Sequence, residues 1–223
     1  NAMCTLVYTS GTTSEPKGVM LSHKNLSADT IATSKSILVP DSSMLVLPLN
    51  HTYAIIAAIT VPLLVGSSIF INKSLKNLMT DMSFCKPKFI AVVPLMMDTF
   101  YKKIIEKLKS TNKEAVINKL LIVSNALRKI GIDLRRKLFA KILEAFGGNL
   151  ELIAVGGAPI NEKTVAGLTD FGITVVGGYG TSECSPLVSA ARNKQYCPDS
   201  AGGVFSGVEV RIVNSEIQVK GDI

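Results

Sequence analysis

The hydrophobic and polar positions of this chain form short apolar runs that alternate with segments of helical periodicity. The apolar runs are rich in branched side chains, which is typical of strands buried on both faces. They cover 6–8, 44–47, 68–71, 89–93, 150–155 and 173–176. Helical spacing fills the segments 23–37, 53–64, 75–84, 95–108, 113–129, 133–146 and 162–171. This alternation predicts an α/β fold with a largely parallel sheet flanked by helices.

The pattern changes near the end of the chain. Residues 208–213 and 216–219 alternate with period two around Asn214-Ser215, which predicts a β-hairpin. We therefore expect an α/β part over 4–203 and the truncated start of a β subdomain over 204–223. The first three residues, with Asn1-Ala2 before Met3, resemble an expression-tag remnant.

Composition sets limits on the class of protein. Of 223 residues, 47% are hydrophobic, which is enough for a substantial core. No apolar run reaches the roughly 18 residues that a membrane-spanning helix needs, and no signal peptide is recognisable. The four cysteines form no C-x-x-C pair, and the two histidines are not spaced to complete a zinc site. Reduced thiols and a cytoplasmic location are expected.

The net charge of +7 is concentrated in one region. Residues 102–141 hold twelve Lys or Arg against three acidic residues, a local net charge of +9, so the remainder carries −2. A solvated basic helix face is the simplest interpretation. The alternatives are an anionic membrane surface, which would make the protein membrane-associated, or an anionic partner. No aromatic interleaving or nucleic-acid motif accompanies the charge, so no DNA or RNA partner is expected.

A loop suited to polyphosphate follows the first apolar run. It reads Tyr8-Thr9-Ser10-Gly11-Thr12-Thr13-Ser14-Glu15-Pro16-Lys17-Gly18. Glycine lets the backbone approach a ligand closely, hydroxyls and N–H groups donate to phosphate oxygens, and lysine supplies a positive charge. A plain polar surface loop would share this composition. The P-loop of the common nucleotide hydrolases does not fit, because Pro16 precedes Lys17 and Gly18 follows it.

Two further glycine-rich loops follow predicted strands. Gly156-Gly157-Ala158-Pro159 comes after 150–155, and Gly177-Gly178-Tyr179-Gly180-Thr181-Ser182-Glu183 comes after 173–176. Ligands of parallel sheets gather where strands end. A tyrosine between glycines has a free face for a base, a serine hydroxyl can reach a phosphate, and a glutamate is a suitable Mg²⁺ ligand. Either loop alone is better explained as a structural turn.

Taken together, the three loops resemble the signature of the AMP-forming, adenylate-forming enzymes, with Ser14 where glycine is usual. The order and approximate spacing of the loops match that superfamily from about residue 4 to the end. The resemblance implies that Gly157, Ala158 and Pro159 flank adenine, that Tyr179 stacks on it, and that Glu183 holds Mg²⁺. The implied ATP- or AMP-binding residues are Thr9, Ser10, Gly11, Thr12, Thr13, Lys17, Gly157, Ala158, Pro159, Gly178, Tyr179, Gly180, Thr181 and Ser182.

His51 indicates which branch of the superfamily is closest. The segment Pro48-Leu49-Asn50-His51 precedes an apolar helix, and it resembles the Pro-Leu-x-His segment that borders the acyl pocket of acyl- and aryl-CoA synthetases. Amino-acid-activating relatives place an aspartate near here, whereas no acid occurs between Asp41 and Asp81. With Phe146-Gly147-Gly148-Asn149-Leu150 and the basic insert, the chain looks most like the long-chain fatty acid–CoA ligase branch.

The resemblance implies an activity and also what this chain lacks. The expected reaction is ATP- and Mg²⁺-dependent conversion of a fatty acid to acyl-AMP and then, with coenzyme A, to acyl-CoA. The family's ribose-binding aspartate and its C-terminal domain with the adenylating lysine would lie beyond Ile223. We therefore expect a central fragment that does not turn over alone. The alternatives are an aryl- or short-chain acid–CoA ligase, and a nucleotide-binding module without catalysis.

Overall fold

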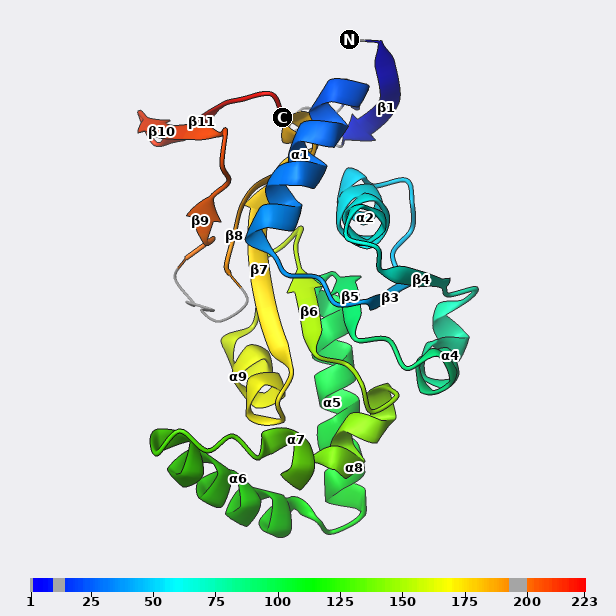
Figure 1. Ribbon diagram of the computed structural model, residues 1–223, viewed down its shortest axis with the longest axis vertical. Coiled ribbons are helices and arrows are strands. Elements are labelled where there is room, and N and C mark those ends of the chain that lie inside the picture. The colour runs from blue at the N-terminus through cyan, green and yellow to red at the C-terminus, as the bar shows by residue number, and fades with distance from the viewer. Residues whose placement is uncertain (1, 10–14, 193–199) are drawn as a thin grey trace.

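A single sheet with the strand order β4-β3-β5-β6-β7-β8-β9 runs through the computed structural model, which describes residues 2–9, 15–192 and 200–223 (Figure 1). Its strands are β3 (Ser42–Leu45), β4 (Ser68–Ile71), β5 (Phe89–Val92), β6 (Leu152–Val155), β7 (Thr174–Gly180), β8 (Leu187–Ala190) and β9 (Gly203–Val204). The first five in spatial order are parallel, and β8 and β9 add antiparallel to β7. The predicted α/β class with a largely parallel sheet is confirmed.

The centre of the sheet explains why the apolar runs form strands. All four residues of β5 and all four of β6 are buried, and the two strands pair from Phe89 opposite Leu152 to Val92 opposite Val155. A strand that is covered on both faces has no polar side to alternate with, so its sequence is continuously apolar. Aromatic rings extend this core, with the Phe139 and Phe171 centroids 5.3 Å apart.

The helices fall into two groups. The first group contacts the sheet through α1, η1 and α3, and comprises α1 (His23–Ser36), α2 (Thr52–Ile55), the π-helical turn η1 (Ile56–Thr60) and α3 (Val61–Leu64). The second group gathers toward the amino ends of the strands (Figure 1), and comprises α5 (Pro94–Ser110), α6 (Glu114–Lys129), α7 (Arg135–Leu138), α8 (Ala140–Leu143), η3 (Glu144–Phe146) and α9 (Glu162–Asp170). Beside β4, the short η2 (Leu75–Asn77) leads into α4 (Leu78–Cys85).

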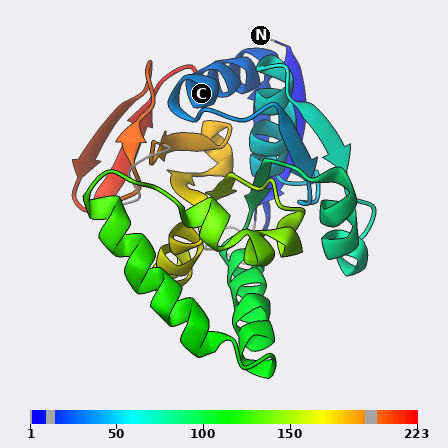
Figure 2. The ribbon, with the colours of Figure 1, turned by 60° about the horizontal axis from the view of Figure 1, so that its bottom comes forward.

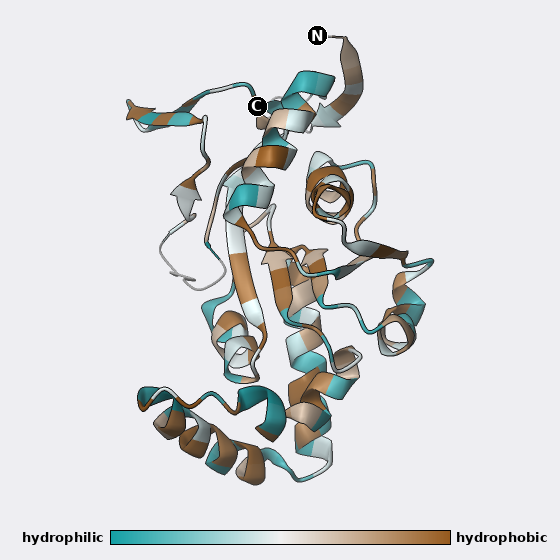
Figure 3. Cartoon of the chain, viewed as in Figure 1, coloured by the Kyte–Doolittle hydropathy of each residue, from teal (hydrophilic) through white to brown (hydrophobic). Residues whose placement is uncertain are grey.

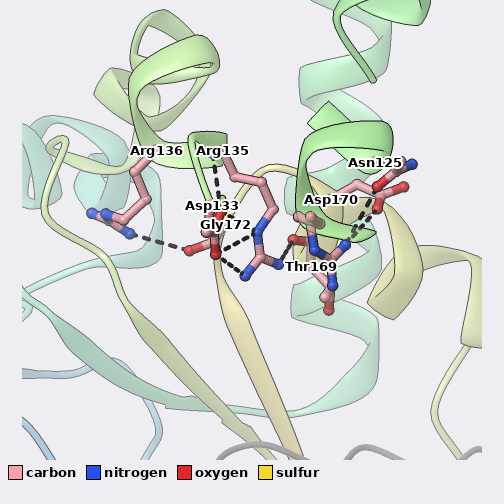
Figure 4. A network of polar contacts seen from close by, with 8 residues as sticks. Asn125, Asp133, Arg135, Arg136, Thr169, Asp170 and Gly172 are labelled. Carbon is pink, nitrogen blue, oxygen red and sulfur yellow. Dashed lines mark hydrogen bonds and ion pairs between the residues drawn. The ribbon is translucent and has the colours of Figure 1, made fainter. Parts of the chain in front are cut away.

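Two arginines of α7 hold it to its neighbours. Arg136 donates to the carbonyls of Leu150 at 2.7 Å and Gly148 at 3.0 Å, which precede β6. Arg135 donates to the carbonyl of Thr169 on α9 at 2.6 Å (Figure 4). Buried or terminal carbonyls need such donors, and hydrogen bonds from a charged group are the stronger kind. Part of the basic region is therefore structural.

The C-terminal hairpin is confirmed. β10 (Glu209–Val213) pairs antiparallel with β11 (Glu216–Lys220). Asn214 and Ser215 both have positive φ, +50° and +65°, as the tight turn between paired strands requires. After the hairpin, Asp222 accepts a hydrogen bond from Lys24 Nζ at 2.7 Å, which ties this end of the chain to α1.

Several boundaries differ from the sequence prediction. Residues Lys17–Ser22 form β2, which pairs antiparallel with β1 (Met3–Thr9) in a separate two-stranded sheet. The expected helix over 133–146 is divided into α7, α8 and η3, because Phe139 leaves helical geometry at φ −106° and ψ 19°. β8 and β9 were not predicted, since neither lies in a long apolar run. No helix of the described residues is both long and apolar enough to cross a membrane.

Candidate functional site

A cleft of about 610 Å³ opens at the carboxyl ends of the parallel strands. It is lined by segments that are far apart in the sequence: residues 46–48 after β3, the start of α2, the loop after β6, and the loop between β7 and β8. Among the predicted site residues, it brings together His51, Gly157, Gly178, Gly180, Thr181 and Ser182. This is where a parallel α/β sheet places its ligands.

The pairing of β6 with β7 sets the loops that follow them side by side. Val155, the last residue of β6, pairs with Gly177 on β7, so residues 156–159 lie at the same sheet edge as residues 178–182. Gly157 has φ +88°, a conformation that L side chains rarely adopt, and its backbone lines the cleft. The cleft wall here is mostly backbone, which leaves N–H and C=O groups accessible to a ligand.

The loop after β7 turns back sharply against β8. A side chain at Gly180 would collide with the carbonyl oxygen of Pro186, so only glycine permits this approach. The loop contains η4 (Ser182–Cys184), and the chain then returns through Pro186 to Leu187 on β8. Thr181 and Ser182 are thereby held at the cleft edge, where their hydroxyls are at least partly exposed.

Asp29 fixes the far end of this loop from within the core. Its side chain is fully buried on α1, and its carboxyl accepts hydrogen bonds from Leu187 N at 3.2 Å and Thr33 Oγ1 at 3.3 Å. Burial raises the pKa of Asp29 to about 8, against the lowering effect of those two hydrogen bonds. Asp29 was missed from the sequence, where one acid among the polar residues of a helix gives no sign of burial.

The predicted phosphate loop connects β1 to β2. Thr9 pairs with Lys17 across this hairpin, and β2 lies against η4 of the loop after β7. Lys17 is exposed. The predicted residues Ser10, Gly11, Thr12 and Thr13 lie outside the described residues. The packing of β2 on η4 brings the strand that carries Lys17 close to the segment that carries Ser182 and Glu183.

His51 marks the apolar side of the cleft. It is the exposed N-cap residue of α2, and it makes no capping hydrogen bond through its side chain. Leu47, Leu75 and Met96 line the cleft together with it, and none of the described residues that line the cleft is acidic. The cleft therefore has a glycine- and hydroxyl-rich end and an aliphatic end.

Tyr53 separates this cleft from the interior. Its ring packs on Gly156, where an added Cβ would lie 3.1 Å from ring carbons. It also lines a small apolar cavity of about 20 Å³ between the helices and the sheet. Its buried hydroxyl has no hydrogen-bond partner among the described residues, and burial raises its pKa. An orphaned polar group of this kind is costly in a native core, and sequence reasoning gave no indication of it.

Four predicted residues lie beside the cleft without lining it. Ala158 and Pro159 are exposed in the loop after β6, and Tyr179 is half-buried on β7, where it pairs with Ser189. Glu183 is exposed in η4, with no partner for its carboxylate among the described residues.

The side chains of this site fit a Mg²⁺ ion that is bound mainly by the phosphates of a nucleotide, and not one that is held by the protein alone. The described residues contain no cluster of three or more His, Cys, Asp or Glu side chains that could hold a metal ion by themselves. Mg²⁺ typically keeps waters and binds one or two carboxylates together with substrate phosphates. One unpaired carboxylate, that of Glu183, at the rim beside the hairpin of Lys17 suits that arrangement.

Comparison with known proteins agrees with this geometry. The family model described as "AMP-binding enzyme" matches residues 1–223. The chain therefore belongs to the AMP-binding enzyme family, and the resemblance to AMP-forming acyl-CoA synthetases noted in the sequence is confirmed.

The individual curated relatives share about 30% of their residues with this chain over the matched region. "Long-chain-fatty-acid–CoA ligase 5" of Rattus norvegicus is 31% identical over 228 residues, which cover 95% of this chain and 32% of that protein. "Fatty acyl-CoA synthetase A" of Dictyostelium discoideum is 28% identical over 222 residues, which cover 95% of this chain and 33% of that protein. The chain thus spans about a third of the length of these curated relatives.

Solved structures support the fold. O-succinylbenzoate coenzyme A synthetase from Bacillus subtilis, in complex with AMP, superposes with a TM-score of 0.70 at 19% identity, covering 99% of this chain and 41% of that one. Apo MatB from Rhodopseudomonas palustris superposes with a TM-score of 0.68 at 23% identity, covering 99% of this chain and 39% of that one. At these identities the likeness establishes the architecture alone.

Proposed function

We propose that the enzyme containing this chain activates a fatty acid with ATP to acyl-AMP and transfers the acyl group to coenzyme A. The observation that carries the proposal is the two-ended cleft, which has backbone and hydroxyls at one end and aliphatic side chains at the other. A nucleotide needs the first kind of surface and an acyl chain needs the second. The matched fatty acyl-CoA synthetases support the choice of acid.

The polar end of the cleft is the proposed nucleotide site. Gly157, Ala158 and Pro159 would flank adenine, and Tyr179 would stack on it. Ser182 would donate its hydroxyl to the α-phosphate. The hairpin of Thr9 and Lys17, with Ser10 to Thr13, would hold the β- and γ-phosphates, because its second strand lies against η4. Mg²⁺ held by Glu183 would neutralise phosphate charge.

The aliphatic end is the proposed acyl site, with His51 at its edge. Leu47, Leu75 and Met96 offer apolar surface there. A substrate ammonium would require a carboxylate partner, and the described part of the chain places no acidic residue in the cleft lining. A carboxylic acid without an α-amino group therefore fits better than an amino acid.

The proposed chemistry has two displacements. A carboxylate oxygen attacks the α-phosphorus of ATP, forming the acyl–phosphate bond while the bond to the bridging oxygen breaks and pyrophosphate leaves. The coenzyme A thiolate then attacks the acyl carbon, and AMP departs as the carbon–oxygen bond breaks. In the first step these residues position the reactants and stabilise charge on the phosphates, which are the main sources of rate in phosphoryl-group chemistry.

Two other functions remain in competition. An aryl- or short-chain acid–CoA ligase would use the same nucleotide end of the cleft and would bind a different acid at the aliphatic end. A nucleotide-binding module without catalysis would use the same loops, because binding and catalysis share them.

A substrate panel distinguishes these functions. Pyrophosphate release by the full-length enzyme is measured with straight-chain fatty acids, o-succinylbenzoate and amino acids, each with and without Mg²⁺. Release that requires a fatty acid and Mg²⁺ is the expected result. Release with o-succinylbenzoate alone would establish the aryl function, and release with amino acids alone would overturn the argument from His51. Nucleotide binding without release under any condition would leave only the binding module.

A further inference from the structure

One face of α6 consists of aliphatic side chains and lysines that are all exposed. At helical spacing, its residues are Ala115, Val116, Lys119, Ile122, Val123, Ala126, Lys129 and Ile130; we call them the outer face of α6. Its larger apolar side chains are far more exposed than an ordinary surface requires, at 57% for Val116, 71% for Ile122, 50% for Val123 and 70% for Ile130. Contiguous exposed apolar surface of this kind marks an interaction site.

The opposite side of α6 packs against α5 and α9 and holds the helix on the protein. Ile117 and Leu121 face α5 and α9 across a cavity of about 110 Å³, and Ser124 is buried. Arg128 forms an ion pair with Asp170 on α9, with 3.8 Å between Nη1 and Oδ1 (Figure 4). The aliphatic side chains of the outer face are therefore not needed to hold the helix in place.

The charges on the outer face all have one sign. Lys119 and Lys129 are its ionisable residues, and both are exposed. Neither forms an ion pair with a carboxylate of the described residues. On α5, Lys103, Lys107 and Lys109 are exposed as well, together with the acidic residue Glu106. By contrast, Arg128, Arg135 and Arg136 of the same basic region are engaged with the protein.

The outer face lies at the end of the molecule away from the cleft. In Figure 2, α6 lies toward the reader with no element of the described chain in front of it, and Figure 3 shows hydrophobic residues along its length. The arrows of β6 and β7 point away from it in Figure 1. Contact with a large flat surface at this end would leave the cleft accessible.

We propose that the outer face of α6 docks on a membrane whose surface carries anionic lipids. Aliphatic side chains can enter the boundary between headgroups and acyl chains, while lysines reach the lipid phosphates and carboxylates. Each lysine near an anionic surface contributes about 1 kcal/mol. A helix face that combines exposed isoleucine and valine with lysine, and that carries no Asp or Glu, is typical of helices at a membrane interface. A helix face that only contacts water is usually polar.

A second copy of the chain fits this face less well. Pairing two outer faces about a twofold axis would bring lysines from both copies onto one apolar seam with no carboxylate to offset them. A lipid surface supplies that negative charge. The proposal does not depend on which acid the enzyme activates.

The test is co-sedimentation of the full-length enzyme with phosphatidylcholine vesicles, with and without phosphatidylserine. The first variant, Lys119→Glu with Lys129→Glu, should lower binding to phosphatidylserine vesicles at least tenfold, since about 1 kcal/mol per lysine is lost and repulsion is added. The second, Ile122→Asp with Ile130→Asp, should abolish binding to phosphatidylserine vesicles. Matched controls are Lys35→Glu with Lys73→Glu, and Leu63→Asp with Phe84→Asp, which make the same number of changes at exposed lysines and exposed apolar residues elsewhere.

Each result decides the proposal. Binding that requires phosphatidylserine and is lost in the α6 variants but kept in the controls supports it, provided that pyrophosphate release without vesicles is unchanged. Absence of wild-type binding, or equal losses in variants and controls, overturns it. Light scattering is run in parallel: a dimer in the wild type that becomes a monomer in Ile122→Asp with Ile130→Asp would show that a second copy covers the face, which also overturns it.

Discussion

The carboxyl and amino ends of the parallel strands differ in the size of the side chains that surround them. At the carboxyl ends, glycines and small hydroxyl residues form one end of a cleft whose other end is aliphatic. At the amino ends, long side chains close the structure, as Arg136 does when it donates to the carbonyls of Leu150 and Gly148. Small residues line the loops after β6 and β7, where a ligand is expected, whereas long side chains anchor the helices at the other end.

This contrast indicates which substitutions should affect chemistry and which should affect stability. Changes in the loops after β6 and β7 should alter catalysis with little effect on unfolding, whereas changes among the amino-end arginines should do the reverse. Asp29 lies between these cases, because it is a core residue that holds a cleft loop.

The largest effect is expected at Glu183. Glu183→Gln removes the proposed Mg²⁺ ligand, and we expect pyrophosphate release by the full-length enzyme to fall by about 100-fold or more, because charge stabilisation on the phosphates is lost. Its exposed side chain makes no contact that folding requires, so the melting temperature should not change. Glu162→Gln, also exposed, on α9, is the matched control. Equal activity of the two variants would remove Glu183 from the site.

Asp29 should make the protein less stable as the pH rises. Its folded pKa of about 8 lies above the unfolded value of about 3.9, so the folded state binds the extra proton. The free energy of unfolding contributed by this group should be highest below pH 4 and fall, by on the order of a few kcal/mol, as the pH rises to about 8.

Asp29→Asn tests that slope, because its amide oxygen can still accept from Leu187 N while no charge can form. Urea unfolding at pH 5 and pH 9 should show a smaller difference for the variant than for the wild type. Parallel pH profiles for the two proteins would show that Asp29 is not the titrating group.

Arg136 should affect stability alone. Arg136→Met keeps apolar length but leaves the carbonyls of Leu150 and Gly148 without their donor, at a cost of about 2 kcal/mol in unfolding free energy. The KM for ATP should be unchanged, because these carbonyls lie at the far end of β6. Lys137→Met, at an exposed neighbouring position, is the control. A raised KM with unchanged stability would contradict the division between the two ends.

The smallest effect is expected at Ser182. Ser182→Ala removes one hydroxyl from the polar end of the cleft, and a single hydrogen bond is worth about 1 kcal/mol, or roughly a fivefold rise in the KM for ATP. Ser206→Ala in the segment before β10 provides a matched control. No change in the KM, with the wild-type response to fatty acid retained, would show that Ser182 does not contact the nucleotide.

The sequence predicted the regular part of the fold because it depends on local pattern. The buried strands β5 and β6 are continuous apolar runs, and the hairpin turn at Asn214-Ser215 carries its own signal. β8 and the break at Phe139 were not predictable, because each is set by tertiary packing. Local periodicity contains no information about which neighbours a residue will meet.

The residues of the candidate site also divide into those that sequence motifs predicted and those that only the structure revealed. His51 and Ser182 were predicted from motifs, and the structure places both at one cleft. Tyr53 and Asp29 were not, because the significance of each lies in its burial, Tyr53 with an unsatisfied hydroxyl and Asp29 with a hydrogen bond from Leu187 N, and burial of a single polar residue leaves no trace in composition. The roles assigned to Tyr179, Glu183 and the phosphate loop stay predictions.

Hydrogen–deuterium exchange of the full-length enzyme with and without ATP and Mg²⁺ tests the central claim most directly. If the nucleotide binds at the carboxyl ends of the strands, amide exchange should slow in residues 156–159 and 178–184 and in the hairpin around Lys17. Exchange in α6 should stay unchanged, because it lies at the other end of the sheet. Protection confined to α6, or none in either glycine-rich loop at saturating nucleotide, would contradict the account.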